Sequence, residues 1–230
     1  MPYKYDINEQ FFERWFPEMA YVLGWIYSDG TLRGNRYQFK IATNDQEVLE
    51  NIKEMMGSNH RIAKRKDPRR KKITFELVID SKRIYGSLVR LGVTPNKNKD
   101  MRLPKIPRKY LPYFLRGYFE GDGTVYIDTP GVYKGKAYKR VYCRFCSASR
   151  QFLADLQKTF TQQLGLRPKK LRKNHSAFDI GYSTKEALVL LRYLYKDKLN
   201  MRLERKYKRL IKYESLFRAN QYWAKKKGVK

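Results

Sequence analysis

The chain contains one sequence pattern twice, and this duplication limits its possible folds more than any other feature. The segment YVLGWIYSDGT at 21–31 aligns with FLRGYFEGDGT at 114–124, and both end in Asp-Gly-Thr after a matching glycine. Two later pairs of segments keep the alignment, 36–52 with 140–156 and 74–88 with 177–191. Because repeated sequence usually means a repeated structural unit, we expect two halves of the same design.

Each copy shows the same order of patterns: a helix that ends in Asp-Gly, two strands, a second helix, two more strands and a third helix. The first helix is expected to begin near Pro17, a good first-turn residue, and to end at Gly30. Residues 36–41 alternate strictly between polar and apolar, and residues 140–145 do the same, as half-buried strands do. The predicted fold class is therefore α+β, with two pseudo-symmetric αββαββα halves.

Capping and turn residues predict where further elements begin and end. Asn44 and Glu47 have the spacing of a capping box, which predicts a helix that stops at Gly57. The second copy carries an insertion near 129–139, and its two glycines and three lysines favour a long basic hairpin loop.

The two copies are separated by residues 94–107, which are rich in Pro, Asn and Lys and are typical of a linker. We therefore place an N-terminal half at 1–97 and a C-terminal half at 98–230. The second half is expected to end in a basic amphipathic helix that starts near residue 198.

The charge of the chain is strongly unbalanced. It carries 51 Lys and Arg against 22 Asp and Glu, a net charge of +29. Residues 101–230 hold 32 of the basic and 9 of the acidic residues, so 32 − 9 gives +23 for the second half. A folded protein this basic repels itself, which favours a polyanionic partner over a merely solvated surface.

The composition also bears on the compartment. No apolar run approaches the ~18 residues of a membrane span. The N-terminal segment lacks the apolar core of a signal peptide and is too acidic for a transit peptide. The 2 cysteines cannot form a disulfide framework, which favours a reducing compartment. We expect a protein of the cytoplasm (nucleoid) or of an organellar matrix, neither secreted nor attached to a membrane.

The outward positions of the alternating strands are rich in groups that bind nucleic acid. They are Arg36, Gln38 and Lys40 in the first copy, and Arg140, Tyr142 and Arg144 in the second. Two such sheet faces would form one long positive saddle, and a β-ribbon fits the DNA major groove. The alternative is an ordinary amphipathic sheet that faces water. Basic runs at 61–72 and 167–175 suit phosphate contacts, which position a duplex without reading it.

Two carboxylates stand at the C-terminal ends of the matching helices, where the helix dipole disfavours an anion. Asp29 and Asp122 therefore need a positive group nearby. Each helix also carries small residues on one face, four positions apart: Gly24 with Ser28, and Gly117 with Gly121. If the helices pack by these faces, the two carboxylates emerge side by side. Like charges that close need a divalent metal or a raised pKa, and oxygen ligands suit Mg²⁺ or Ca²⁺.

The segments VLGWIYSDG at 22–30 and LRGYFEGDG at 115–123 resemble the motif that names the LAGLIDADG homing endonucleases. The doubled motif is similar to that of the single-chain members and covers roughly residues 17–215. The resemblance implies a monomer that mobilises an intron or intein, with paired halves forming a DNA-binding saddle. It implies Mg²⁺-dependent cleavage of both strands at a long asymmetric site, with short 3′ overhangs. It also implies metal ligands at Asp29 and Asp122, with Ser28 and Gly121 beside them, and Ca²⁺ that supports binding without cleavage.

The same resemblance indicates further catalytic candidates. Lys82 and Lys185 occupy matching positions just inside a helix, where family members often have a basic residue that activates water or stabilises the scissile phosphate. The alternative is a pair of plain surface lysines. The capping pattern of Ser183 and Glu186 supports this register. Glu120 matches the first acid of the motif but lies earlier in the helix, so it is not assigned to the metal.

The predicted DNA contacts lie on the strands and their loops. Lys40 and Arg144 match a peripheral position of the family's active site. The full predicted set is Arg33, Arg36, Gln38, Lys40, Lys64, Lys66, Thr74, Glu76, Tyr126, Arg140, Tyr142, Arg144 and Arg172.

Two rival functions remain open at this point. An intron RNA maturase on the same fold would need the same basic saddle. A non-catalytic DNA-binding protein would also use it, although such a protein gains nothing from carboxylates that face phosphates.

Overall fold

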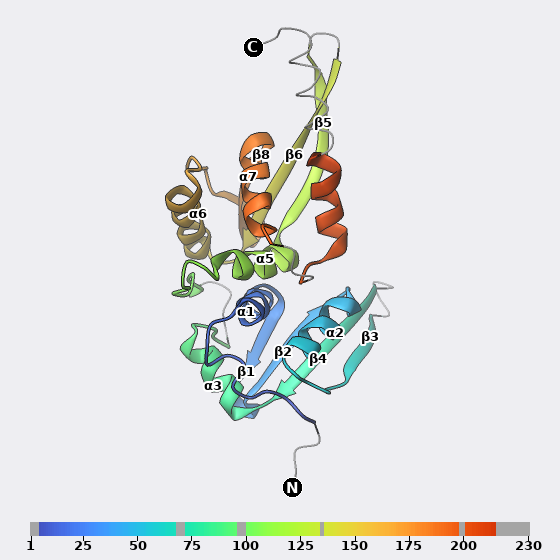
Figure 1. The fold of residues 1–230 in the computed structure, drawn as a ribbon, viewed down its shortest axis with the longest axis vertical. Helices are drawn as coiled ribbons and strands as arrows, with labels where there is room; N and C mark the ends of the chain where they lie inside the picture. Colours follow the sequence, from blue (N-terminus) through green and yellow to red (C-terminus); the bar gives the residue numbers. More distant parts are fainter. Residues whose placement is uncertain (1–4, 68–71, 96–99, 134–135, 198–200, 215–230) are drawn as a thin grey trace.

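The structure is a computed structural model that describes residues 5–67, 72–95, 100–133, 136–197 and 201–214. Its first half begins with helix α1 and a short hairpin, and a second helix, a second hairpin and a third helix follow (Figure 1). The elements are α1 (Pro17–Asp29), β1 (Gly30–Arg33), η1 (Gly34–Arg36), β2 (Gln38–Thr43), α2 (Gln46–Met55), β3 (Ile62–Asp67), β4 (Lys72–Asp80) and α3 (Lys82–Arg90).

The second half repeats this order. Its elements are α5 (Leu111–Asp122), β5 (Thr124–Tyr133), β6 (Lys136–Ser147), α6 (Arg150–Leu164), β7 (Arg172–Asn174), β8 (Ala177–Ser183) and α7 (Thr184–Leu194). Residues 204–214 form a further helical segment. Each half has one four-stranded antiparallel sheet, with orders β1-β2-β4-β3 and β5-β6-β8-β7. The predicted α+β fold with two pseudo-symmetric halves is confirmed. The predicted boundary between 97 and 98 lies outside the described residues.

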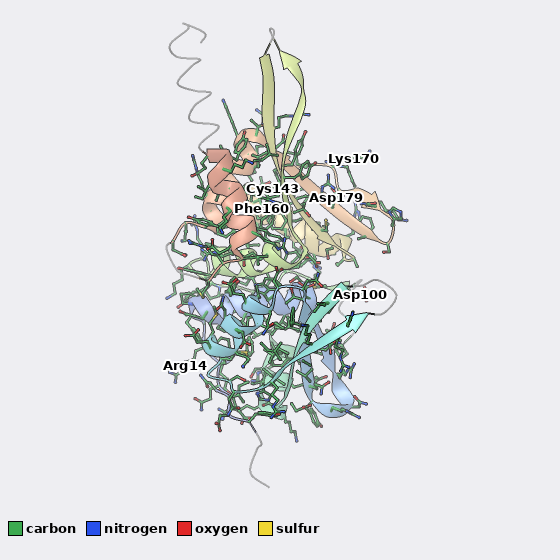
Figure 2. All side chains as sticks on the ribbon, turned by 90° about the vertical axis from the view of Figure 1, so that its right-hand side faces the viewer. Arg14, Asp100, Cys143, Phe160, Lys170 and Asp179 are labelled. Carbon is green, nitrogen blue, oxygen red and sulfur yellow. The ribbon has the colours of Figure 1, made fainter. Side chains whose placement is uncertain are left out.

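The apolar positions of the strands form the core of each half. Phe39 and Ile41 of β2 are buried, as are Cys143 and Phe145 of β6. Cys143 and Phe160 of α6 both belong to the buried core in the second half (Figure 2). The opposite face of each sheet carries the polar strand positions and is not covered by the helices of its half. We call it the open face. Within the described residues, no helix is long and apolar enough to cross a membrane.

The two halves meet along α1 and α5, which lie side by side at the centre of the molecule (Figure 1). Their small residues make this close approach possible, as the sequence predicted. A Cβ on Gly24 would lie 2.7 Å from Tyr118 N and closer still to Phe114 O. A Cβ on Gly117 would collide with Tyr21 O in the same way. The glycines are therefore needed because the partner backbone occupies their side-chain space.

Three local predictions were wrong. The alternation at 36–41 does not begin the strand, because residues 34–36 form a 3₁₀ turn and Tyr37 is left-handed at φ +48°. The β1–β2 hairpin pairs Arg33 with Gln38, so the four residues between them must reverse the chain. Arg36 is therefore in the turn rather than on the strand face.

The second wrong prediction is the capping box. The N-cap of α2 is Asp45 rather than Asn44, and its side chain makes no capping hydrogen bond. Its carboxylate accepts hydrogen bonds from Arg205 instead. At α7 the N-cap is Ser183 as predicted, but without a side-chain cap, and Glu186 pairs with Lys169 at 2.7 Å.

The third is the insertion at 129–139, whose described residues are strand rather than loop. Strands β5 and β6 continue through it and pair Gly131 with Tyr138 and Tyr133 with Lys136. A register shift between Asp128 and Gly131 absorbs the glycine that suggested a turn. The insertion therefore lengthens a β-ribbon.

Gly24→Ala should unfold or severely destabilise the protein, because the new methyl group meets the fixed backbone of α5. We expect a loss of about 3 kcal/mol or more, at the upper end of overpacking effects. Gly86→Ala is the matched control, since it also lies in a helix and its Cβ would meet only Arg90 at 3.7 Å. That change should be neutral or stabilising. Equal melting temperatures for the two variants would contradict the close helix packing.

Candidate metal and nucleic-acid site

The two motif carboxylates lie at the same end of the central helix pair. Asp29 is the last residue of α1 and Asp122 is the last residue of α5. In both helices the next residue is an extended glycine that leads directly into the first strand of the sheet. The helix packing and the strand that follows therefore fix the position of each carboxylate.

The structure brings each carboxylate next to the opposite half. Gly121 lies so close to α1 that a Cβ there would collide with Ser28 Oγ and Asp29 Oδ2. Asp29 and Gly121 line one pocket of about 290 Å³, which also includes Asp45. Asp122 and Ser28 line a second pocket of about 260 Å³. We call these the Asp29 pocket and the Asp122 pocket. All four predicted metal-ligand positions thus come together in crossed pairs.

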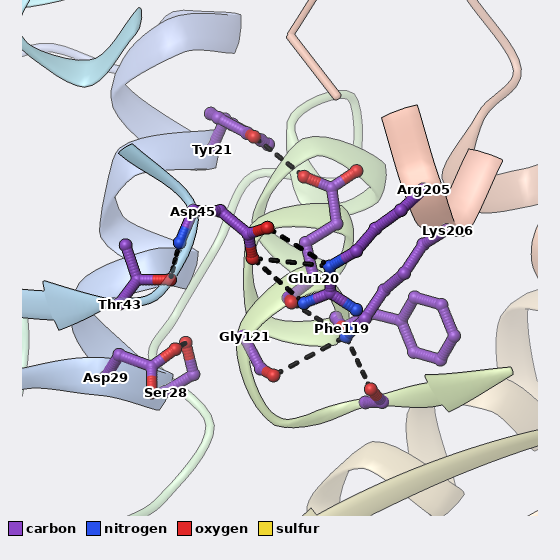
Figure 3. A network of polar contacts seen from close by, with 11 residues as sticks. Tyr21, Ser28, Asp29, Thr43, Asp45, Phe119, Glu120, Gly121, Arg205 and Lys206 are labelled. Atoms are coloured by element: carbon purple, nitrogen blue, oxygen red, sulfur yellow. Dashed lines mark hydrogen bonds and ion pairs between the residues drawn. The ribbon is translucent and has the colours of Figure 1, made fainter. Parts of the chain in front are cut away.

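The positive group that the helix dipole requires is Lys206, which sequence reasoning missed. Its side chain is buried, and Nζ donates to the carbonyl oxygens of Phe119 and Glu120 at 2.7 Å each, and also to those of Gly121 and Gly123 (Figure 3). Three of these carbonyls belong to the last turn of α5 and the fourth to Gly123 just after it, so Lys206 caps the helix end that carries Asp122. Burial, with a smaller contribution from the charge of Arg205, lowers the pKa of Lys206 to about 8, while the charges of Glu120, Asp29 and Asp122 act in the opposite direction.

Glu120 also lines the Asp29 pocket, but its carboxylate has hydrogen-bond partners within the protein. Its carboxylate is fully buried and accepts hydrogen bonds from Tyr21 Oη at 2.7 Å and Tyr195 Oη at 3.0 Å. Burial raises the pKa of this carboxyl, and the two tyrosine hydroxyls partly offset the effect. Glu120 therefore joins α5 to α1 and α7 within the core.

The structure does not bring Lys82 and Lys185 to the carboxylates. Both side chains are exposed, and Lys82 Nζ lies 5.5 Å from the centroid of the Tyr37 ring. Tyr37 lies just before the start of β2 at Gln38. Ile41, three residues further along β2, pairs with Gly30, the residue after Asp29. Three residues of strand span about 10 Å, so Lys82 and the carboxylate lie at opposite ends of β2. The repeat places Lys185 in the same way, after β8.

The open faces carry most of the predicted DNA contacts. In the first half Lys40 lies 3.1 Å from Glu76, which also accepts from Arg65 at 2.7 Å. In the second half, Arg144 and Arg172 each lie 3.8 Å from Asp179. Each open face thus places two cations around one carboxylate. Lys40 and Glu76 match Arg144 and Asp179 in the repeat, whereas the second cation differs in register, since Arg65 faces Thr74 and Arg172 faces Asp179. Arg65 and Asp179 are the members that the sequence prediction missed.

Other predicted contacts are distributed around these groups. The rings of Tyr126 and Tyr142 stack with centroids 5.0 Å apart, and Arg140 lies over Tyr142. Thr74 lines the Asp29 pocket. Gln38 is nearly buried and donates to Asp80 at 2.7 Å, whereas Arg33 and Arg36 are exposed at the β1–β2 turn.

The structure corrects the prediction for two of the DNA contacts, Lys64 and Lys66. Lys64 pairs with Phe75 and Lys66 with Ile73, and Phe75 packs against the core. Directly opposite residues of an antiparallel pair share a face, so both lysines lie on the helix-covered side of edge strand β3. Arg65, opposite Thr74, is on the open face instead. Alternation along a strand explains the error, since a shift of one residue changes the face.

Residues 110–195 match a family model described as a LAGLIDADG-like domain. Over 137 residues the chain is 33% identical to the probable translation initiation factor IF-2 of Thermococcus kodakarensis. That match covers 57% of this chain but 11% of the factor, so the chain spans about a tenth of the length of this relative.

Solved structures show the same fold over nearly the whole chain. The LAGLIDADG meganuclease I-CpaMI bound to uncleaved DNA superposes with a TM-score of 0.59, at 11% identity, over 93% of this chain and 95% of that one. The homing endonuclease I-LtrWI bound to target DNA gives 0.55 at 13% identity, over 97% and 94%. The N-terminal LAGLIDADG domain of DUF199/WhiA gives 0.55 at 15% identity, over 84% and 90%.

Proposed function

We propose that this chain, whose residues 110–195 match a LAGLIDADG-like domain and whose fold is that of the LAGLIDADG endonucleases, is a site-specific double-strand DNA endonuclease that hydrolyses phosphodiester bonds with divalent metal. The observation that carries the proposal is the crossed arrangement of the two motif carboxylates. Each lies in a pocket with a residue of the opposite half, Asp29 with Gly121 and Asp122 with Ser28. A protein that only binds DNA has no use for two anions held at the centre of a basic surface.

The donor atoms of this site fit Mg²⁺. Among the described residues, no three His, Cys, Asp or Glu side chains gather into a metal site. Asp29 and Asp122 offer carboxylate oxygens, and Gly121 and Ser28 line the same two pockets. Mg²⁺ is typically held by one or two carboxylates, with water and substrate phosphate as its other ligands. When bound, it would polarise the scissile phosphate and lower the pKa of the attacking water.

The chain's own residues would bind the duplex and position its scissile phosphates. The open faces of the two sheets would hold the duplex by its phosphates and read base edges along both β-ribbons. The two pockets would each receive one scissile phosphate, one from each strand. Because the halves differ in sequence, we propose that a single chain binds an asymmetric target as a monomer. Sedimentation of an obligate dimer on one target would contradict this.

Cleavage selection on a randomised duplex library tests the function. The wild-type chain with Mg²⁺ should enrich one long non-palindromic sequence, cut in both strands with short 3′ overhangs. Enrichment by binding alone, with no cut in either strand, would instead favour a binding protein on this fold. A structured intron RNA that displaces the duplex would favour the maturase. DUF199/WhiA has the same fold, so the fold alone does not decide between cleavage and binding.

DNA affinity should fall steeply with salt, since many Lys and Arg contacts to phosphate release counterions. Within this trend, Arg65→Ala should weaken binding by about 1 kcal/mol or more, because its guanidinium lies on the open face. Lys64→Ala removes the same charge from the neighbouring residue on the helix-covered face and should cost clearly less. Fluorescence anisotropy over a salt series measures both effects. A flat salt profile, or a larger loss from Lys64→Ala, would mean that the open face is not the binding surface.

A further inference from the structure

The helical segment 204–214 contacts both halves at the candidate site. Arg205 reaches the first half and donates to the carboxylate of Asp45, with Nη2 3.0 Å from Oδ2 and Nε 3.3 Å from each oxygen. The next residue, Lys206, caps α5 in the second half. Buried Leu210 and Tyr213 fasten the segment to the core. The segment therefore holds the backbone of Arg205 in a fixed position beside the site.

Arg205 lines the Asp29 pocket together with Asp29, Gly121 and Asp45. Figure 3 shows the guanidinium beside the Asp45 carboxylate, next to the end of α5. Asp45 takes one edge of the guanidinium. Among the residues that the structure describes, none accepts a hydrogen bond from Nη1.

We propose that Arg205 is a catalytic residue for one of the two strand cuts, a role that rests on the endonuclease function proposed above. Its guanidinium binds a non-bridging oxygen of the scissile phosphate in the Asp29 pocket. In the hydrolysis, water forms a bond to phosphorus and loses a proton to solvent, and the bond from phosphorus to the 3′ oxygen breaks. The 3′ oxygen takes up a proton. Arg205 stabilises the negative charge that builds on the phosphoryl oxygens during this exchange.

Asp45 acts as a positioning residue. It holds Nε and Nη2 of Arg205 and so orients the remaining N–H groups toward the pocket, as a fork-shaped guanidinium allows. The pair is half-exposed, with the Arg205 side chain at 54% and Asp45 at 25%. An ion pair this exposed adds little to folding stability, so its position at the pocket is better explained by substrate binding.

The effect should fall on one strand. Arg205 lies in the Asp29 pocket, whereas the described lining of the Asp122 pocket consists of Asp122 and neutral residues: Tyr27, Ser28, Met101, Cys146, Ser147, Ala148 and Ala177. Among the described residues that line the two pockets, Arg205 is therefore the one cation, and it lies on the Asp29 side.

The test is strand-resolved cleavage by Arg205→Ala, with the full chain, Mg²⁺, and a target duplex that carries a different label on each strand. We expect one strand to be cut about 100-fold more slowly or worse, the scale of losing one charge-stabilising donor, so that a nicked intermediate accumulates. The other strand should keep nearly its wild-type rate. Arg205→Lys should restore part of the lost rate, and Asp45→Asn should slow the same strand less severely.

Arg192→Ala is the matched control. Its side chain is also 54% exposed and joins the same helical segment, through Glu214 at 2.7 Å, but it extends from α7 and lines neither pocket. It should leave both cutting rates unchanged. Wild-type rates for both strands in Arg205→Ala would overturn the role of Arg205 and leave the proposed endonuclease function supported. Equal slowing of both strands, with a lowered melting temperature, would make the residue structural and also overturn it. A wild-type chain that binds its target but cuts neither strand would overturn the endonuclease and this role together.

Discussion

Asp29→Asn and Asp122→Asn should each abolish double-strand cleavage while DNA binding stays intact or becomes tighter. Each change removes one of the two motif carboxylates and leaves a neutral side chain of the same size. The affected cut should slow about 1,000-fold or more, since metal stabilisation of a phosphoryl group is worth several kcal/mol. Binding should not suffer, because an anion beside phosphates opposes the attraction of the basic faces. Cleavage gels and anisotropy on the selected target measure the two effects.

Glu120→Gln is the contrasting control for this pair. Glu120 is the other acid of the second motif and lines the Asp29 pocket, but its carboxylate is fully buried and accepts hydrogen bonds from Tyr21 and Tyr195. The amide oxygen can still accept one of these hydrogen bonds, so the variant should cut both strands, although with a lower melting temperature. Mg²⁺-dependent cleavage by both aspartate variants would overturn the metal assignment.

The helices and the central packing could be predicted from the sequence because their signals are local and repeated. Small residues four positions apart lie on one face of a helix, and their occurrence in both copies indicated which faces meet. The structure bears this out at Gly24 and Gly117, where the partner backbone fills the space of a side chain. The crossed positions of Asp29 and Asp122 follow from that packing alone.

Lys206 and Arg205 could not be identified in the same way. Lys206 is one of 51 basic residues, and its partners on α5 lie more than 80 positions earlier in the chain. The dipole argument predicted that a cation was needed, but only tertiary structure decides which one supplies it. Asp45 illustrates the same limit. The local pattern predicted a capping role for its neighbour Asn44, and it did not indicate that Asp45 pairs with the distant Arg205.

The errors at Lys64 and at the 129–139 ribbon have a different cause. Both depend on strand register, which a run of charged residues does not encode. A shift of one residue exchanges the two faces of a strand, so Arg65 rather than Lys64 lies on the open face. At 129–139 the glycine sits beside a register shift, and the ribbon continues where its composition favoured a loop.

Replacing Mg²⁺ with Ca²⁺ should stop cleavage while specific binding persists. The oxygen donors at Asp29, Asp122 and the neighbouring backbone can accept either ion. Ca²⁺ takes six to eight oxygens at longer and more variable distances, whereas Mg²⁺ demands tight octahedral geometry. In-line hydrolysis needs the attacking water and the leaving oxygen to be held closely, so the looser coordination should leave the substrate bound and intact.

The exchange can be followed in a single tube. The chain should bind its labelled target in Ca²⁺ without cutting, and excess Mg²⁺ should then start cleavage of the complex already formed. Asp29→Asn and Asp122→Asn should lose any gain in specific binding that Ca²⁺ gives the wild type, which connects the ion to the carboxylates rather than to the DNA. Cleavage that runs equally fast in Ca²⁺ or in EDTA would contradict the mechanism. In that case the carboxylates would need another role, and competition by structured RNA for the open faces would become the decisive measurement.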